Sequence, residues 1–276
     1  MFDKSFLPGD HALMIPKTSD GRVLFAVPWH DKIVVGTTDT LVRKSNIEPI
    51  ALEKEIDFVL KTAQKYLTKD PTRADVLSVF AGLRPLAAPE KKGQATKEVS
   101  RSHKIIVSKT GLVTITGGKW TTYRKIAEDI IDKTIIAHQL PQKKCVTEHL
   151  SIHGNKKNST ADFENHLFIY GTDSDAILQL QENEPELKEK LHPNYNYTLA
   201  EAVWAIRQEM AISVEDVLAR RVRLLFLDAR AAIASAEKIA HLLAKELGHD
   251  EVWIQNQLAE FKAVANGFLL KEFRVS

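Results

Sequence analysis

The spacing of apolar residues changes once along this chain, near residue 140. Before that point, short β-branched runs at residues 11–15, 22–27 and 32–36 are separated by turn residues, which is typical of an antiparallel sheet. Beyond residue 154 the spacing is helical, and helices are predicted over 173–182, 198–210, 213–223, 228–247 and 250–273. The sequence therefore predicts an α+β fold, with a β-rich domain over residues 1–140 and an all-helical C-terminal domain over residues 147–276.

The first part also contains helical spacing. Apolar residues between 52 and 67 follow Pro49 at helical intervals, and a second helix is expected over 120–137. Further strands are predicted at 76–81, 104–108, 112–116 and 148–153.

Composition narrows the class of protein. Apolar residues make up 44% of the 276 residues, and no apolar run reaches the roughly 18–20 residues that cross a bilayer. The start of the chain does not resemble a signal peptide, and Cys145 is the single cysteine. We expect a reducing, cytoplasmic setting. Residues 1–145 hold 24 Lys and Arg against 16 Asp and Glu, whereas residues 146–276 hold 14 against 20. A basic half suits an anionic ligand, although ordinary solvated surfaces would show the same imbalance.

Several common catalytic devices are missing from the sequence. It contains neither a Gly-x-Gly-x-x-Gly dinucleotide loop nor a Gly-x-Ser-x-Gly nucleophile elbow. Gly117-Gly118-Lys119 is not a P-loop, because Trp120 replaces the required hydroxyl residue. His149 and His153 are four apart in a predicted strand rather than on a helix, so we expect no metal site.

Three cationic segments lie at strand ends beside glycines or a proline. Arg84 precedes Pro85, which holds its backbone extended, and Arg101 opens the next strand. In the third segment a strand ends in Gly117-Gly118, and Lys119 opens a helix whose N-terminal N–H groups suit an anionic partner. Each segment alone fits a surface salt bridge or a helix-entry turn. Together they favour a shared anion site.

The third segment carries a family resemblance. Residues 117–125, Gly-Gly-Lys-Trp-Thr-Thr-Tyr-Arg-Lys, resemble a block of the FAD-dependent glycerol-3-phosphate dehydrogenases. Residues 81–86 resemble that family's arginine motif, and residues 27–29 with 36–39 resemble its β-meander. Residues 214–232 are similar to its helical C-terminal domain, so the resemblance spans essentially the whole chain.

The resemblance implies a reaction and roles for particular residues. Members oxidise sn-glycerol 3-phosphate to dihydroxyacetone phosphate by transferring hydride to FAD. Arg84 and Arg101 would bind the substrate phosphate, with Arg84 the firmer match. Lys119 would lie between flavin and substrate. Gly117, Gly118, Thr121 and Thr122 would present donors to the flavin edge.

The resemblance also implies that part of the enzyme is missing here. The Rossmann segment that grips FAD, and a substrate-side histidine that could serve as the base, would both lie upstream of Met1. We therefore expect a C-terminal portion that does not hold FAD tightly or turn over alone. Neither His30 nor His103 is assigned as a replacement base.

Two other interpretations remain open at this stage. One is a related flavoprotein that oxidises an amine or a 2-hydroxyacid. The other is a non-catalytic binding or docking module whose acidic helical half contacts a partner subunit or a second copy. A quinone-type electron acceptor is expected, and no nucleic-acid partner. Arg220, Arg221 and Arg223 raise the alternative of a peripheral contact with the inner face of a membrane, against that of a solvated helix face.

Overall fold

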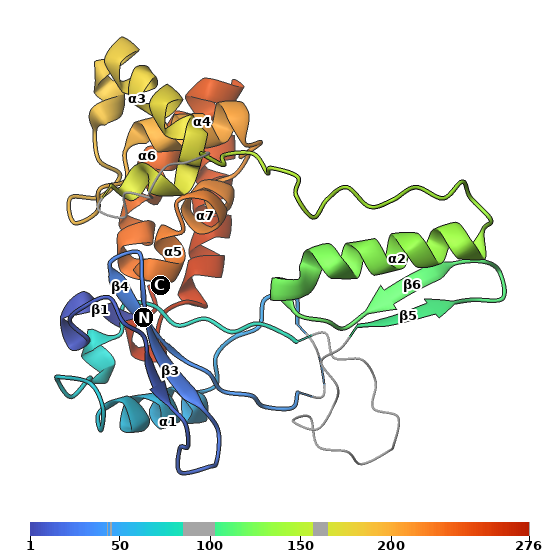
Figure 1. Cartoon of the computed structure of the whole chain (residues 1–276). Helices are drawn as coiled ribbons and strands as arrows, with labels where there is room; N and C mark the ends of the chain where they lie inside the picture. Colours follow the sequence, from blue (N-terminus) through green and yellow to red (C-terminus); the bar gives the residue numbers. More distant parts are fainter. Residues whose placement is uncertain (43, 45, 85–102, 157–164, 276) are drawn as a thin grey trace. The chain divides into compact units, whose positions relative to one another are not determined.

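The computed structural model describes residues 1–42, 44, 46–84, 103–156 and 165–275. The chain divides into two compact units. The first unit joins residues 1–82 with residues 156–276, and the second unit covers residues 83–155. Figure 1 shows the first unit as a blue sheet region with yellow-to-red helices, and the second as a green helix on a two-stranded sheet.

The N-terminal sheet is antiparallel, with the order β1-β4-β3-β2. Its strands are β1 (Phe2–Asp3), β2 (Leu13–Ile15), β3 (Leu24–Trp29) and β4 (Lys32–Gly36). The buried Leu24 and Ala26 flank the exposed Phe25 on β3, because successive side chains of a strand point to opposite faces. The predicted antiparallel meander is confirmed.

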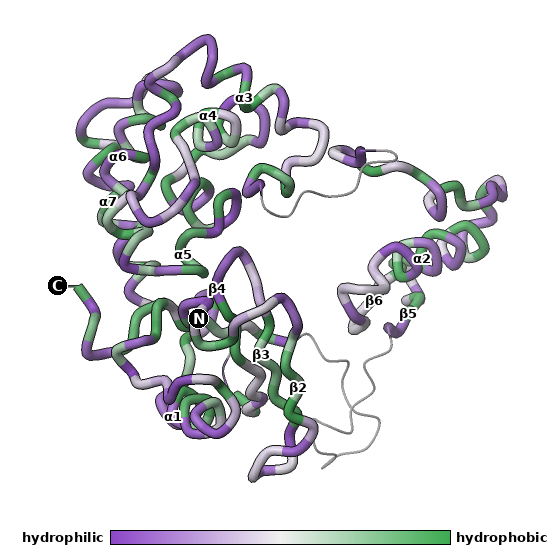
Figure 2. Tube along the Cα trace, turned by 60° about the vertical axis from the view of Figure 1, so that its left-hand side comes forward, coloured by the Kyte–Doolittle hydropathy of each residue, from purple (hydrophilic) through white to green (hydrophobic). Residues whose placement is uncertain are grey.

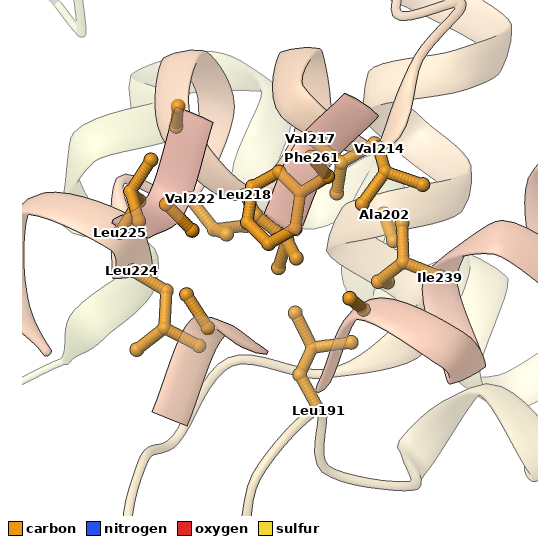
Figure 3. Packing of buried hydrophobic residues seen from close by; sticks show 14 of the residues in the cluster. Leu191, Ala202, Val214, Val217, Leu218, Val222, Leu224, Leu225, Ile239 and Phe261 are labelled. Carbon is orange, nitrogen blue, oxygen red and sulfur yellow. The ribbon is translucent and has the colours of Figure 1, made fainter. Parts of the chain in front are cut away.

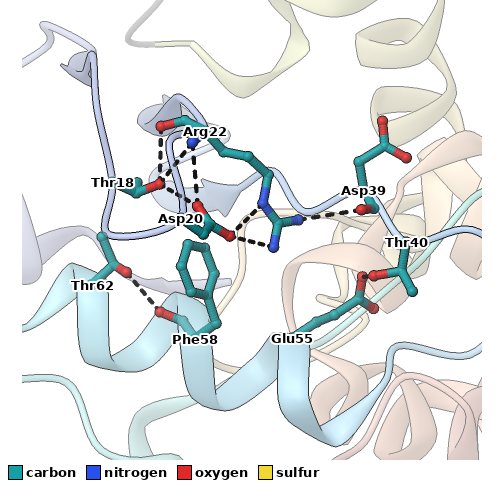
Figure 4. A network of polar contacts seen from close by, with 8 residues as sticks. All are labelled: Thr18, Asp20, Arg22, Asp39, Thr40, Glu55, Phe58 and Thr62. Atoms are coloured by element: carbon teal, nitrogen blue, oxygen red, sulfur yellow. Dashed lines mark hydrogen bonds and ion pairs between the residues drawn. The ribbon is translucent and has the colours of Figure 1, made fainter. Parts of the chain in front are cut away.

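Helix α1 (Glu53–Ala63) places Ile56 and Leu60 in a small core with Phe2 and Phe6. Ahead of this helix, a polar network joins the segment after β2 to the segment after β4 (Figure 4). Arg22 donates to Asp20 from Nε at 2.6 Å, and its guanidinium lies 4.9 Å from the ring centre of Phe58 on α1.

The strand predicted over 76–81 is absent, and no strand is assigned there. Its backbone hydrogen bonds are made to several different segments, and not to one neighbouring strand as in a sheet. Leu77 donates to the carbonyl of Met1 at 3.0 Å, and Val79 donates to the carbonyl of Phe268 at 2.8 Å. Apolar periodicity cannot separate such a buried connector from a strand.

The rest of the first unit is helical. Its described helical elements from residue 165 onward are η5 (His166–Asp173), α3 (Ser174–Asn183), η6 (Pro185–Lys188), α4 (Leu199–Gln208), η7 (Asp216–Arg221), α5 (Leu224–Leu227), α6 (Ala229–Leu247), α7 (Glu251–Asn266) and η8 (Lys271–Phe273). Buried residues of α4, η7, α5, α6 and α7 form the main core. Figure 3 shows the ring of Phe261, from α7, among side chains of η7 and α6. The predicted α+β class with a helical C-terminal region is confirmed.

Two of the predicted C-terminal helices differ in detail. The segment predicted as a helix over 213–223 forms a π-helical turn, in which Val222 donates to the carbonyl of Val217 at 3.0 Å. The helix predicted to reach residue 273 ends at Asn266, because Leu269 and Leu270 leave the helical path and are buried.

The second unit consists of β5 (Lys104–Val107), β6 (Val113–Thr116), the short η4 (Trp120–Thr122) and α2 (Tyr123–Ala137). Ile105 pairs with Ile115 across the two strands, and α2 contacts both strands. The predicted strand over 148–153 is not formed.

The boundary expected between residues 140 and 147 falls inside the second unit. The N-terminal sheet shares the main core with the helices, because Met1 is buried there and Trp29, Val34 and Leu77 pack against it. The hydropathy tube in Figure 2 shows the apolar segments of strands and helices within this unit. No helix within the described ranges is both long and apolar enough to span a bilayer.

Candidate functional site

The candidate site is built on the turn between β6 and α2. Gly117 and Gly118 have φ angles of 78° and 97°, a left-handed region that disfavours residues with a Cβ atom. Lys119 then returns to extended backbone, with φ −120° and ψ 146°, and η4 begins at Trp120. The turn therefore brings together five of the residues singled out in the sequence: Gly117, Gly118, Lys119, Thr121 and Thr122.

Gly118 has a packing role as well as a conformational one. A Cβ atom at this position would lie 2.5 Å from Cδ1 of Ile126 on α2 and 3.5 Å from Cβ of His103. A Cβ atom here would require the end of the Ile126 side chain to shift, so the glycine adds to the close packing between α2 and the end of β6. The sequence interpretation attributed this glycine to the approach of a ligand, and the structure adds a reason internal to the fold.

The helix start after the turn has no side-chain cap. Neither the side chain of Lys119, before η4, nor that of Thr122, before α2, accepts a hydrogen bond from a backbone N–H group of the helix that follows it. The first backbone N–H groups of a helix have no partner within the helix, so without a side-chain cap they require an acceptor from outside it. The Thr122 hydroxyl donates to the carbonyl of Lys119 at 3.0 Å, so its hydrogen is already used. Of the two threonines, Thr121 keeps its hydroxyl hydrogen for a ligand.

Lys119 is exposed at this helix start. Within the described ranges, no carboxylate forms an ion pair with its ammonium group. Trp120, next in the chain, is 86% exposed and stacks on Tyr123 with ring centres 5.5 Å apart. A cation, uncapped N–H groups and an aromatic pair therefore lie within one turn of chain. The aromatic pair was missed from the sequence, although the spacing of three residues on a helix could have indicated it.

A second contact joins α2 to the residue just before β5. The ring Nε2 of His103 lies 2.9 Å from Oδ2 of Asp129 on α2, and Lys125 lies 2.9 Å from Oδ1 of the same carboxylate. The hydrogen bond from Lys125 is the main cause that lowers the pKa of Asp129. His103 follows Arg101 by two residues, so this contact anchors the chain just after that arginine. No local pattern in the sequence could have joined His103 to Asp129.

Of the two arginines expected to bind phosphate, the structure describes one. Arg84 is exposed and belongs to the same unit as Lys119. Arg101 lies outside the described residues.

The other candidates are placed as follows. His149 and His153 are exposed, and the described residues contain no group of three or more His, Cys, Asp or Glu side chains placed to hold a metal ion. Arg220 is paired with Glu215 at 2.5 Å and with Asp216 at 2.8 Å. Arg221 is paired with Glu209 at 3.4 Å. These two charges are therefore neutralised by neighbouring carboxylates.

Comparison with known families gives two overlapping matches. Residues 108–253 match the C-terminal domain of alpha-glycerophosphate oxidase, and residues 4–124 match the FAD dependent oxidoreductase family.

The chain is also similar in sequence to individual curated proteins. The chain is 36% identical over 265 residues to the probable mitochondrial glycerol-3-phosphate dehydrogenase of Caenorhabditis elegans, covering 88% of this chain and 36% of that protein. It is 34% identical over 292 residues to the mitochondrial glycerol-3-phosphate dehydrogenase of Arabidopsis thaliana, covering 95% and 46%. The chain thus spans less than half the length of these curated relatives.

The fold also matches a solved structure. The glycerol-3-phosphate dehydrogenase from Bacillus halodurans, solved in complex with FAD, superimposes with a TM-score of 0.79 at 25% identity. The match covers 100% of this chain and 57% of that one.

Proposed function

Because the chain belongs to the family of FAD-dependent glycerol-3-phosphate dehydrogenases and oxidases, we propose that it supplies the substrate side and the helical domain of a flavoprotein that oxidises sn-glycerol 3-phosphate to dihydroxyacetone phosphate. The observation that carries the proposal is the turn at residues 117–122. It combines an exposed lysine with an uncapped helix start, in a chain whose sequence also contains an arginine motif of the same family.

The residues of the turn fit a flavin ring. Its edge carries carbonyl oxygens and ring nitrogens that accept hydrogen bonds, and the uncapped N–H groups of η4 and the Thr121 hydroxyl are donors without a side-chain partner. The exposed Trp120–Tyr123 pair adds a flat apolar surface beside Lys119. When bound, FAD supplies the capacity to accept a hydride from carbon.

This chain would contribute residues that bind the substrate phosphate and a positive charge that stabilises negative charge during the reaction. Lys119 places a positive charge where the substrate oxygen or a reduced ring carries negative charge, which stabilises that charge without reorganisation of the protein. Arg84 and Arg101 hold the substrate phosphate, because a guanidinium offers two parallel donors to a phosphate. His103 and Asp129 act as positioning residues, since their contact holds the strand start after Arg101 against α2.

The proposal includes a quinone-type carrier as the electron acceptor. It also places the protein in the cytoplasm, either free or in peripheral contact with a membrane. The ion pairs of Arg220 and Arg221 favour a solvated helix face over a membrane-binding patch at that place.

The proposal is tested in a chimaera that joins this chain to the part of the Bacillus halodurans enzyme outside the structural match. Flavin absorption of the desalted protein reports assembly, and dye reduction with sn-glycerol 3-phosphate reports turnover. Lys119→Met is expected to lower kcat by about 10²–10³-fold with flavin retained, as removal of a charge-stabilising donor does in other enzymes.

Lys109→Met is the matched control, because Lys109 is exposed in the β5–β6 turn of the same unit and away from the helix start. An assembled, flavin-containing chimaera that reduces the dye with glycine or lactate but not with sn-glycerol 3-phosphate would overturn the substrate assignment. Equal kcat for Lys119→Met and Lys109→Met would overturn the role of Lys119.

A further inference from the structure

Residues 77–80, which lead to the arginine segment, each contact the helical part of the first unit. The backbone N–H of Ala229, at the start of α6, donates to the carbonyl of Leu77 at 3.1 Å. The Ser78 hydroxyl donates to the carbonyl of Leu225 on α5 at 3.0 Å, and Ser78 is 1% exposed. The first two of the four residues are therefore fixed by hydrogen bonds to α5 and α6.

The other two residues are held by the segment that follows α7 and by a row of aromatic rings. Val79 donates to the carbonyl of Phe268 at 2.8 Å. The ring of Phe80 meets the ring of Phe226 on α5 edge-on, with ring centres 5.1 Å apart, and Phe226 meets Phe268 in the same way at 5.1 Å. Edge-to-face rings at this separation attract each other. Phe226 and Phe268 also pack against the main core, so the rings connect Phe80 to that core.

The exposed arginine segment begins directly after these four residues. Residues 81–84 are all exposed, and the boundary between the two units falls after Gly82. Arg84 is four residues beyond Phe80, which limits their separation to about 14 Å even in a fully extended chain. Pro85 restricts the backbone of Arg84 from the other side. Phe80 therefore joins an anchored segment to the exposed one that carries the arginine.

We propose that Phe80 and Phe226 are positioning residues for Arg84, through which α5 acts on the binding of the substrate phosphate. This inference rests on the proposed function, because it takes Arg84 as a residue that binds the phosphate. Neither aromatic ring touches the substrate in this role, since both act through the backbone that leads to the arginine. Helix α5 thereby has a task in substrate binding besides packing in the main core.

The physical reason is the conformational entropy that binding removes. A guanidinium on a freely moving segment loses this entropy when it binds a phosphate, whereas a guanidinium on a segment that is already held loses less. Breaking the contact of Phe80 with α5 adds one mobile residue at the start of the arginine segment. We expect this change to weaken phosphate binding by about threefold to tenfold.

The kinetic constants separate positioning from a purely structural role. The phosphate of sn-glycerol 3-phosphate is not on the carbon that is oxidised, so a contact to it is the same before and during the reaction. Losing such a contact raises KM and leaves kcat unchanged. A loss of folded protein instead lowers the measured rate at every substrate concentration and leaves KM unchanged.

The first test measures KM and kcat for sn-glycerol 3-phosphate in the flavin-containing chimaera. Phe80→Ala removes the ring at a residue that is 40% exposed, and it is expected to raise KM by about threefold to tenfold at unchanged kcat. Phe80→Tyr keeps the ring and is expected to restore the wild-type KM. Phe168→Ala is the matched control, because Phe168 is 38% exposed on η5 of the same unit, and both constants are expected to stay unchanged.

Phe226→Leu tests the same contact from the side of α5. Leucine remains apolar and fills much of the space of the ring, so the main core keeps most of its packing. KM is expected to rise as in Phe80→Ala. The double variant Phe80→Ala, Phe226→Leu is expected to raise KM no further, because both changes break one contact. Two effects that multiply would show that the rings act independently, and would overturn the proposal.

The second test needs neither flavin nor turnover. Phenylglyoxal modifies arginine side chains, and mass spectrometry of the peptide that contains Arg84 gives the rate of modification in the full chain. Inorganic phosphate is expected to slow this rate in wild type and Phe80→Tyr. In Phe80→Ala the same protection is expected to need a phosphate concentration about threefold to tenfold higher.

The two tests distinguish the failure of this inference from that of the proposed function. A wild-type chimaera that is inactive with sn-glycerol 3-phosphate would overturn the proposed function, while weaker phosphate protection in Phe80→Ala would still support the positioning of Arg84. Equal protection in wild type and Phe80→Ala, or no protection in wild type, would overturn the inference. So would an active chimaera in which Phe80→Ala lowers kcat at unchanged KM.

Discussion

Gly118 and Lys119 are neighbours in the chain with opposite surroundings. Gly118 packs against Ile126 and His103, whereas Lys119 extends to solvent at the helix start. The short block that contains both therefore serves two purposes, since one residue lets α2 pack closely and the next carries the charge.

We expect Gly118→Ala to lower the free energy of unfolding of the second unit by about 1–3 kcal/mol. The added Cβ would contact Cδ1 of Ile126 at 2.5 Å, and alanine disfavours a φ of 97°. Hydrogen exchange of the α2 amides measures the change. The double variant Gly118→Ala, Ile126→Ala relieves the contact but not the backbone strain, so part of the loss should return. A single variant as stable as wild type would show that the turn adjusts freely.

At the scale of elements, hydrogen bonds to the carboxylate of Asp20 stabilise the segment between β2 and β3. Asp20 accepts from the Thr18 hydroxyl at 2.6 Å and from Arg22 Nε at 2.6 Å. These hydrogen bonds lower the pKa of Asp20 to about 2, below its usual range, and the bond from Arg22 has the largest effect. Because the folded-state pKa is depressed, the bonds contribute stability above pH 4, and this is lost as pH falls from about 4 to about 2.

Asp20→Asn is therefore expected to lower the free energy of unfolding at pH 7 by at most about 1 kcal/mol, since the ion pair is partly exposed. The variant should also show a smaller loss of stability than wild type between pH 4 and pH 2. Denaturant titrations at several pH values measure both effects. Asp10→Asn is the control, because the Asp10 side chain is 98% exposed. A wild-type acid response in Asp20→Asn would contradict the prediction.

The π-helical turn η7 shows where local pattern is insufficient. Residues 213–223 have ordinary helical spacing of apolar side chains, and Val214, Val217 and Leu218 are all buried as that spacing requires. The wider turn and the left-handed Arg223 that follows it are not encoded in that spacing. They are followed at once by Leu224 and Leu225, which are both fully buried in the main core.

At the scale of the whole molecule, the two units differ in how much they bury. None of the 15 residues of α2 is buried, whereas nine residues of the 19-residue α6 are buried. Few buried contacts mean a low free energy of local opening.

We therefore expect the amides of α2 to exchange at least about tenfold faster than those of α6 in the same chain. Hydrogen exchange read by mass spectrometry or NMR measures both helices in one experiment. Helix α7, which buries Ile254, Phe261 and Ala265, serves as an intermediate reference. Equal protection of α2 and α6 would contradict the view that the second unit is only weakly stabilised by its own contacts.

The sequence by itself determined the α+β class, the antiparallel meander, most helices of the C-terminal region and the Gly-Gly-Lys turn, because each is encoded by spacing within a few residues. The family followed from short blocks of residues for the same reason. The sequence did not determine the connector at 76–81, the His103–Asp129 contact or the division into units. These depend on which distant segments the folded chain brings together, and packing and charge between distant segments leave no local period in the sequence.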